Sequence, residues 1–416
     1  MSKPTVTLCM IVKDETHIIE QCLRSMAPYV DRYDITDTGS TDGTPELIKK
    51  IMDELEIPGE VYLSDWKGFG DHANRIGSRT EAFHNAETGG AEYAWVIDAD
   101  DYIEGKFKYP KNMTADGYTL FIKRGDFSWW RNQIFKLKLG WRYVGVLHEY
   151  ADATKKEQAQ FEKIEGKYNI SARTEGNRNV GITPVEKYSR DAEILEKAID
   201  DEPKNSRYQF YLAQSYFDAQ QWEKSKEAYK KRVEQGGWNE EVFYSQFRVG
   251  LLCGILQEPF EMILKEMLEA YNIRPIRAEP LVEISRLYRM KEKPASAYPF
   301  ARLAADIPYP QQDILFISED IYQFGALDEV GATAFYAGRP HEGHQACKKL
   351  LTENRVPKDH IERVKQNLEQ YEKVMAQVQA QEMQSNMQSQ VEKLQKKKKK
   401  LESVKRTTYK KRPAKK

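Results

Sequence analysis

Short β-rich runs alternate with amphipathic stretches over roughly the first 150 residues of the chain. Buried strands are expected at residues 5–12, 33–36, 60–63 and 93–97. Apolar side chains at helical spacing predict helices at residues 16–30 and 44–56. Strands that alternate with helices indicate βαβ units and a mainly parallel sheet. Such sheets bind ligands at the carboxyl ends of their strands, so the residues after each strand are the first candidates for chemistry.

From about Thr183 to Tyr371 the apolar residues follow helical spacing only. Pairs of helices are expected at residues 206–236, 240–272, 279–306 and 327–353. A recurrence of about 34–37 residues is typical of tetratricopeptide-like arrays, in which several stacked repeats bury a shared core. The sequence therefore predicts an α/β domain at residues 1–180, helical repeats at residues 181–357, and a long helix with a disordered basic tail at residues 358–416.

Charge is spread unevenly along the 416 residues, although the formal net charge is zero. Residues 391–416 contain thirteen Lys or Arg and two Glu, a net charge of plus eleven, so the remainder carries minus eleven. The body of the chain is therefore not a polyanion binder by composition. The tail has the charge for salt-sensitive, sequence-independent binding to nucleic acid. A solubilising or nuclear-targeting extension is the simpler interpretation.

Cysteine usage and hydropathy both indicate an intracellular protein. No CxxC pair or regular spacing links the four cysteines, which are expected to be reduced and mostly buried: Cys9, Cys22, Cys253 and Cys347. No apolar run reaches the ~18–20 residues that span a bilayer. The apolar N-terminus is followed by charged residues 13–15, where a signal peptide needs small ones. We expect a cytoplasmic protein, or a nuclear one in a eukaryotic host, that has no membrane partner.

Three polar motifs follow predicted strands: Lys13-Asp14-Glu15, Asp37-Thr38-Gly39-Ser40 and Asp98-Ala99-Asp100. Two carboxylates one residue apart can hold Mg²⁺ or Mn²⁺ through oxygen atoms, and phosphate oxygens can complete the shell. A cation in this position neutralises the charge that grows on a diphosphate leaving group. The alternative is that Asp98 and Asp100 only cap a turn.

The second motif contains an acidic residue that helix capping does not explain. Gly39, Thr41 and Asp42 fit an ordinary connection from a strand through a turn to a helix. Asp37 precedes that turn, where its carboxylate could accept a hydrogen bond from a ribose hydroxyl or a base edge. We therefore count Asp37 among the candidate ligand-binding residues.

Taken in order, the motifs of residues 5 to about 250 resemble GT-A family 2 glycosyltransferases with helical repeats behind the catalytic domain (SunS-like members). The resemblance rests on LCMIVKDETHIIEQCLRSM, DTGSTDGT, WKGFGDHANRIGS, WVIDADD and WWRNQIFKLKLGWRYVGVLHEY. It implies a Rossmann-like nucleotide-diphospho-sugar transferase domain, a nucleotide-sugar donor (usually UDP-linked), a divalent metal and inversion at the anomeric carbon. Asp14 stands where relatives commonly have Asn. Asn74-Arg75 reverses the usual Arg-Asn order, which leaves open which of the two contacts the donor.

The resemblance assigns roles to the residues that match the family's motifs. Asp37 would contact the uridine, Asp98 the ribose and the metal, and Asp100 would be the principal metal ligand. Arg75 would lie near the pyrophosphate, because a guanidinium suits phosphate oxygens. The alternative for Arg75 is a surface charge on a helix. Lys13, after the first strand, is also expected to bind the cofactor.

His148-Glu149 follows a further apolar run, YVGVL. Imidazole suits Mn²⁺ better than Mg²⁺, so His148 could complete the metal shell. Glu149 could be the general base that takes the acceptor proton, and Asp126 is the rival base. The alternative is a hydrogen-bonded histidine beside a solvated glutamate.

These features favour a metal-dependent inverting glycosyltransferase that moves a sugar to a hydroxyl on a protein, glycan or modified nucleobase. The alternative is a non-catalytic helical-repeat scaffold that carries a degenerate glycosyltransferase domain. Five polar groups on one edge favour the enzyme, because a scaffold has no need of them. Helical repeats commonly supply a concave surface for an extended partner, which makes a protein acceptor reasonable. The sequence leaves open whether the chain forms oligomers.

Overall fold

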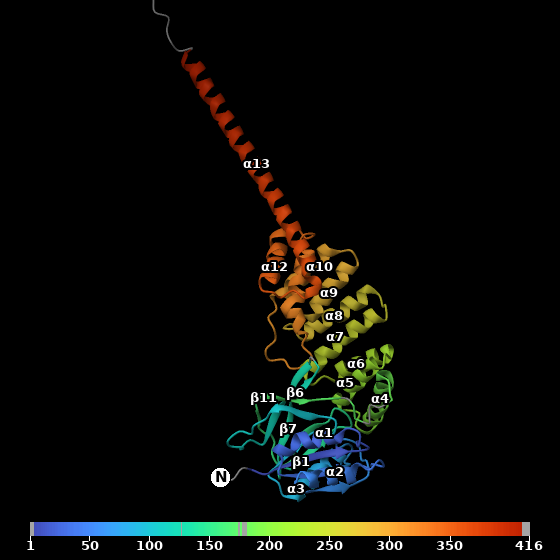
Figure 1. Ribbon diagram of the computed structural model, residues 1–416. Coiled ribbons are helices and arrows are strands. Elements are labelled where there is room, and N and C mark those ends of the chain that lie inside the picture. The colour runs from blue at the N-terminus through green and yellow to red at the C-terminus, as the bar shows by residue number, and fades with distance from the viewer. Residues whose placement is uncertain (1–3, 126, 174, 177–180, 410–416) are drawn as a thin grey trace, which may run out of the picture. The chain divides into compact units, whose positions relative to one another are not determined.

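The computed structural model describes residues 4–125, 127–173, 175–176 and 181–409 (Figure 1). The chain forms two compact units, Met1–Gln235 and Gly236–Lys416. The sequence placed a domain boundary after residue 180, whereas the first three helices after the sheet belong to the sheet-containing unit. The reason is local packing: Tyr208 contacts His72, with their ring centroids 5.6 Å apart.

A nine-stranded mixed sheet forms the centre of the first unit. Its strand order is β3-β2-β1-β4-β7-β6-β11-β5, and β10 pairs with β6. The strands are β1 (Val6–Val12), β2 (Arg32–Asp37), β3 (Gly59–Leu63), β4 (Tyr93–Val96), β5 (Tyr102–Lys106), β6 (Gly117–Arg124), β7 (Phe127–Lys136), β10 (Phe161–Lys163) and β11 (Lys167–Ser171). The expected parallel pairing holds from β3 to β4. The sheet as a whole is not mainly parallel, because β7 runs antiparallel to β4 and β6, and β11 runs antiparallel to β5.

Helices and a small second sheet complete the first unit. They are α1 (Ile19–Met26), η1 (Ala27–Tyr29), α2 (Thr44–Glu54), α3 (Ser78–Gly89), α4 (Pro184–Asp201), α5 (Ser206–Asp218), α6 (Trp222–Gln235), and the paired strands β8 (Trp141–Val144) and β9 (Tyr150–Ala153). The two predicted N-terminal helices and the helix pair at residues 206–236 are confirmed.

Alternate residues of β1 enter two separate apolar cores, as the two-residue period of a strand requires. Leu8 and Met10 are buried in one core with Ile48 of α2. Cys9 is buried in the other core with Phe83 of α3. All four cysteines are buried and free, which confirms the expectation of reduced thiols. The carboxyl end of β1 is therefore fixed between two packed layers.

The second unit is helical throughout its named elements (Figure 1). They are α7 (Asn239–Ile255), α8 (Phe260–Ile273), α9 (Glu279–Met290), α10 (Pro294–Asp306), η3 (Ile321–Gly325), α11 (Ala326–Thr333), α12 (Pro340–Thr352), η4 (Lys358–His360) and α13 (Ile361–Tyr409). Consecutive helices pack on each other as α7 with α8, α9 with α10, and α11 with α12. The three helix pairs predicted after residue 240 are confirmed.

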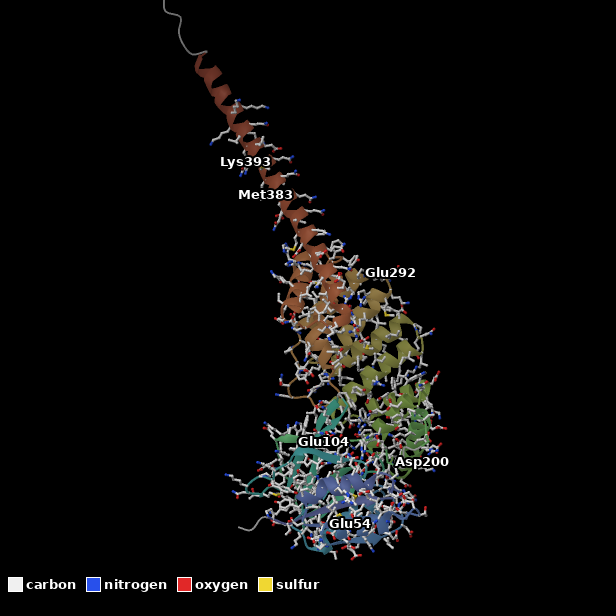
Figure 2. The ribbon with its side chains drawn as sticks, in the orientation of Figure 1. Glu54, Glu104, Asp200, Glu292, Met383 and Lys393 are labelled. Atoms are coloured by element: carbon white, nitrogen blue, oxygen red, sulfur yellow. The ribbon has the colours of Figure 1, made fainter. Side chains whose placement is uncertain are left out.

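Helix α13 is much longer than its packed part. Val364 and Tyr371 are buried, whereas Met383 and Lys393 are exposed and extend from the helix surface (Figure 2). Helical structure continues to Tyr409, so most of the basic tail is helical, and residues 410–416 lie outside the described part. Across the described residues, no helix is both long and apolar enough to cross a membrane.

Candidate functional site

A pocket of about 670 Å³, here called the rim pocket, lies at the carboxyl ends of β1, β2 and β4. Lys13 follows β1, Thr38 follows β2, and Asp98 and Asp100 follow β4, and all four line it. The edge between β1 and β4 is where the strand order reverses, which is the ligand position in open α/β sheets. The three motifs that the sequence placed on one edge therefore meet in one pocket.

The rim pocket has a surplus of positive charge. Three acidic residues line it, Glu15, Asp98 and Asp100, against five basic ones: Lys13, Arg79, Arg124, Arg173 and Lys187. A concave surface with excess cations concentrates anions. The pocket is therefore suited to a phosphate-bearing ligand.

Arg173 lines this pocket and has one guanidinium nitrogen without a hydrogen-bond partner among the described residues. Its Nε donates to the Asp100 carbonyl at 2.7 Å, and its Nη1 donates to Gln21 Oε1 at 2.9 Å. Its Nη2 is buried and has no hydrogen-bond partner within the described part of the chain. A buried donor without a partner is costly, and an anionic oxygen in the pocket would relieve that cost.

Asp37 has two carboxylate oxygens in different situations. Oδ1 accepts hydrogen bonds from the backbone N–H groups of Gly39, at 3.0 Å, and Ser40, at 2.9 Å. Asp37 therefore stabilises the turn, a structural role that was not predicted from the sequence. Oδ2 is buried and has no hydrogen-bond partner among the described residues. This oxygen therefore lacks a partner beside Thr38 of the rim pocket, although Asp37 itself does not line that pocket.

Arg79 joins two of the predicted site residues. Its Nη2 lies 2.8 Å from Asp98 Oδ1, and its Nε lies 2.8 Å from Glu149 Oε1. Arg131 Nη1 lies 3.5 Å from the other oxygen of Asp98. Burial alone would raise the pKa of Asp98, but the charges of Arg79 and Arg131 outweigh it and lower that pKa. Asp98 is therefore held as a carboxylate.

A second pocket of about 500 Å³ shares this ion pair. Arg79 and Asp98 line both pockets, whereas Glu149, Arg131 and Gln133 line only the second. Glu149 is thus next to the residues that bound the rim pocket, although it does not face that pocket itself. The carboxylate of Glu149 therefore belongs to a pocket that adjoins the positively charged rim pocket.

Asp101, the last acidic residue of the cluster, has a structural position. Its Oδ2 lies 3.0 Å from Arg131 Nη2, and its Oδ1 accepts the N–H of Arg173 at 3.2 Å. Its side chain is buried, and burial together with the nearby charge of Asp98 raises its pKa. Asp101 fixes two arginines rather than facing either pocket.

The described side chains provide too few ligands to enclose a metal ion. They fit a cation whose coordination is completed mainly by a bound ligand. Asp100 Oδ2 accepts the N–H of Gly176 at 3.1 Å, and Asp100 Oδ1 has no partner in the part described. Asp98 is already paired with arginines. The described segments contain no group of three or more His, Cys, Asp or Glu side chains that could hold a metal ion. Mg²⁺ is commonly bound by one or two carboxylates, with phosphate oxygens and water completing the shell.

His148 lines neither pocket. Its ring stacks on Tyr211 of α5, with a centroid distance of 3.9 Å and an interplanar angle of 10°. Its backbone has a φ of 51°, and its carbonyl accepts a hydrogen bond from Arg207 Nη2 at 3.3 Å. The structure therefore does not bring His148 together with Asp98 and Asp100.

Arg75 also lies outside both pockets. Its side chain is 73% exposed and its Nη2 lies 3.4 Å from Asp201. Arg79, four residues further along the chain, lines both pockets instead. Arg79 was not among the predicted site residues, although it directly follows the WKGFGDHANRIGS motif and is the second residue of α3. Asp126, the rival base, lies outside the described residues.

Comparison with known proteins identifies the repeat region but not the sheet-containing domain. No family model matches the chain. A TPR repeat-containing protein of Synechococcus elongatus is 32% identical over 98 residues, which cover 24% of this chain and 21% of that protein. The chain thus matches about a fifth of that relative's length.

Two solved structures are similar at low identity. MamA is 15% identical, with 41% of this chain and 90% of that chain covered and a TM-score of 0.33. YrrB, described as a TPR protein with an unusual peptide-binding site, is 13% identical, with 40% and 78% covered and a TM-score of 0.30. With TM-scores this low, neither likeness supports a functional argument. The curated relative and the consecutive helix pairs indicate a TPR-like repeat region, and no comparison supports a glycosyltransferase domain.

Proposed function

We propose that the first unit is a glycosyltransferase that takes its sugar from a nucleotide-sugar, with UDP as the expected nucleotide. The proposal depends on two buried atoms that have no hydrogen-bond partner among the described residues. One is an acceptor, Asp37 Oδ2, and the other is a donor, Arg173 Nη2. A nucleoside diphosphate supplies a matching pair, a hydroxyl or N–H donor at one end and phosphate oxygens at the other. The surplus of positive charge in the rim pocket supports the same ligand.

Side chains of the rim pocket, together with Asp37 directly before the lining residue Thr38, can bind each part of such a donor. Asp37 Oδ2 accepts from the ribose or the base. Trp66 and Phe69 line the pocket with their rings at 4.8 Å and an interplanar angle of 85°, which offers an aromatic surface to a base. Lys13 and Arg173 hold phosphate oxygens through charge-assisted hydrogen bonds.

Asp100 is the residue that would hold a divalent cation beside the diphosphate, and Asp98 lines the same pocket. When bound, Mg²⁺ or Mn²⁺ supplies neutralisation of the negative charge on the leaving diphosphate. Arg79 and Arg131 keep Asp98 ionised and fixed, so its position does not depend on the cation. His148 as a further metal ligand stays a prediction that this geometry does not favour.

Glu149 is the proposed general base. The acceptor hydroxyl gives its proton to Glu149 as its oxygen bonds to the anomeric carbon, while the bond from that carbon to the diphosphate oxygen breaks. This single displacement inverts the anomeric configuration. Arg79 Nε, 2.8 Å from Glu149 Oε1, orients the carboxylate and leaves Oε2 to receive the proton. Asp126 remains the alternative base.

A second function is favoured by the comparisons, because the curated relative is a TPR repeat protein. The repeat region would then act as an interaction scaffold for an extended protein or peptide, with or without catalysis by the first unit. Three properties remain predictions: nucleic-acid binding by the basic segment of α13, self-association of the chain, and a cytoplasmic or nuclear location.

Isothermal titration with UDP and UDP-glucose, with and without Mn²⁺, tests the proposal together with an assay of UDP-glucose hydrolysis. We expect Mn²⁺-dependent binding and slow hydrolysis, both reduced at least tenfold in Asp100→Asn. Asp53→Asn, an exposed carboxylate of α2, is the matched control and should leave both unchanged. If neither nucleotide binds the full-length protein, the scaffold function stands alone.

A further inference from the structure

Gln133 of β7 is a buried amide for which the described residues provide no hydrogen bond. Its side chain is 1% exposed, and neither Nε2 nor Oε1 has a partner in that part of the chain. Gln133 is one of the residues that line the second pocket, as is Glu149. Buried amides in proteins are almost always hydrogen-bonded to protein or to ordered water, so an amide with both groups unpaired at a pocket is a place where a ligand or a water binds.

Gln133 lies at a local irregularity of strand β7. In the pairing of β6 with β7, Tyr118 is opposite Ile134 and Thr119 is opposite Asn132, so Gln133 is the extra residue of a β-bulge. A bulge redirects one side chain out of the regular alternation, and bulges are frequent next to active sites. The bulge thus takes Gln133, a residue that lines the pocket, out of the regular alternation of β7.

The pocket also indicates the chemistry of the missing ligand. An amide with a free donor and a free acceptor matches two neighbouring hydroxyl groups, because each hydroxyl both donates and accepts. The rings of Trp130, Tyr143 and Tyr150 line the same pocket, and Tyr150 is 48% exposed. Aromatic rings beside a few fixed polar groups suit the apolar face and the hydroxyl edge of a pyranose.

We propose that the second pocket binds a neutral sugar and that Gln133 is the residue that selects it. If the second pocket is the acceptor site of the proposed transferase, the acceptor is a glycan that places a hydroxyl beside Glu149. This interpretation rests on the proposed function. As a sugar-binding site, the second pocket stands independently of catalysis. A serine or threonine peptide is the competing acceptor, and a buried water on Gln133 is the competing explanation of the amide.

Thermal unfolding of two Gln→Leu variants separates a binding role from a structural one. Gln133→Leu removes an amide that has no partner in the described chain, so the melting temperature should stay the same or rise. Gln209→Leu is the control: this glutamine is also buried, but its Nε2 donates to the Ala228 carbonyl at 3.0 Å, so its loss should lower the melting temperature. An equal drop in both variants would mean that Gln133 is held by water or by a structural partner, and would overturn the proposal.

Binding is measured by saturation-transfer NMR with methyl pyranosides of glucose, galactose and N-acetylglucosamine, and with a serine-containing peptide. We expect the full-length protein to bind at least one glycoside, with an affinity at least tenfold weaker in Gln133→Leu and unchanged UDP binding. No glycoside binding, equal binding by the variant, or binding of the peptide alone would overturn the sugar assignment. Glycoside binding without UDP binding would instead refute the transferase and leave the sugar site standing.

Discussion

Arg79 Nη2 lies 2.8 Å from Asp98 Oδ1, and this ion pair belongs to the lining of both pockets of the first unit. The same guanidinium reaches Glu149, so one side chain fixes a proposed donor-side carboxylate and the proposed base. The pKa of Arg79 is raised because the charges of Asp98 and Glu149 outweigh its burial, which alone would lower it. Arg79 therefore organises the site without having to react.

Arg79→Met should destabilise the first unit and abolish sugar transfer. Breaking a buried pair costs about 3–5 kcal/mol, and Asp98 is partly exposed and keeps Arg131, so we expect about 2–4 kcal/mol. Arg75→Met, in the segment before α3 and with a side chain that is 73% exposed, should change the free energy of unfolding by less than about 0.5 kcal/mol. Urea unfolding of both variants checks this, and similar losses in the two would contradict the role given to Arg79.

The start of α3 depends on a close backbone approach between two glycines. A Cβ on Gly77 would stand 2.4 Å from the carbonyl of Gly70, and this backbone cannot yield as a flexible side chain would. Gly77→Ala should therefore displace the first turn of α3, which carries Arg79, and cost about 1–3 kcal/mol with reduced activity. Gly254→Ala in α7 meets no atom within 4 Å and should be neutral or slightly stabilising, by up to about 1 kcal/mol. Denaturant midpoints of both variants give the comparison, and an undisturbed Gly77→Ala protein would contradict it.

Asp42 should make stability depend on pH at the acidic end. Its carboxylate accepts hydrogen bonds from the backbone N–H and hydroxyl groups of Thr44 and Thr16. Partial burial alone would raise its pKa, but these hydrogen bonds lower it to about 2. Because this lies below the unfolded value of about 3.9, the stabilisation is complete above about pH 4 and is lost as the pH falls through about 2.

The test is the difference in urea midpoint between the natural protein and Asp42→Asn. That difference should be largest near pH 6 and shrink toward pH 2, where the carboxyl of the folded natural protein is becoming protonated. A difference that stays constant across this range would show that the charge of Asp42 does not stabilise the fold.

In the second unit, Arg277 joins a loop to the helices. Its Nη2 lies 2.6 Å from Glu279 Oε1 and its Nη1 lies 3.3 Å from Asp313 Oδ2, and all three side chains are buried. Arg277→Met would leave two buried carboxylates short of a partner and should cost about 3–5 kcal/mol. Arg286→Met, which removes a partly exposed pair with Glu283, should cost less than about 1 kcal/mol. Equal effects on unfolding would contradict this account.

Local pattern predicted the elements of the chain well, because apolar periodicity reports which face of a strand or helix is buried. The four N-terminal strands and the helix pairs after residue 206 lie where that pattern placed them. The antiparallel half of the sheet was not predicted, since the pairing of β11 with β5 joins residues such as Asn169 and Glu104, which are 65 positions apart, and no local signal encodes it. The short strand β10 was not predicted, for the same reason.

The site was only partly predictable for a related reason. Lys13, Asp98 and Asp100 could be grouped because each follows a strand of one parallel set. Arg173 reaches Asp100 across 73 residues, and no spacing rule connects them. His148 stacks on Tyr211 of a helix whose docking could not be foreseen, which takes its ring away from the predicted metal shell.

The central claim is that the rim pocket binds a nucleoside diphosphate together with a cation. A crystal of the full-length protein grown with UDP and Mn²⁺, measured for anomalous scattering, tests it most directly. We expect UDP in the rim pocket, with a donor of its ribose or base on Asp37 Oδ2 and a single anomalous peak between the diphosphate and Asp100. A rim pocket that stays empty at saturating UDP, or a nucleotide bound elsewhere, would contradict the account.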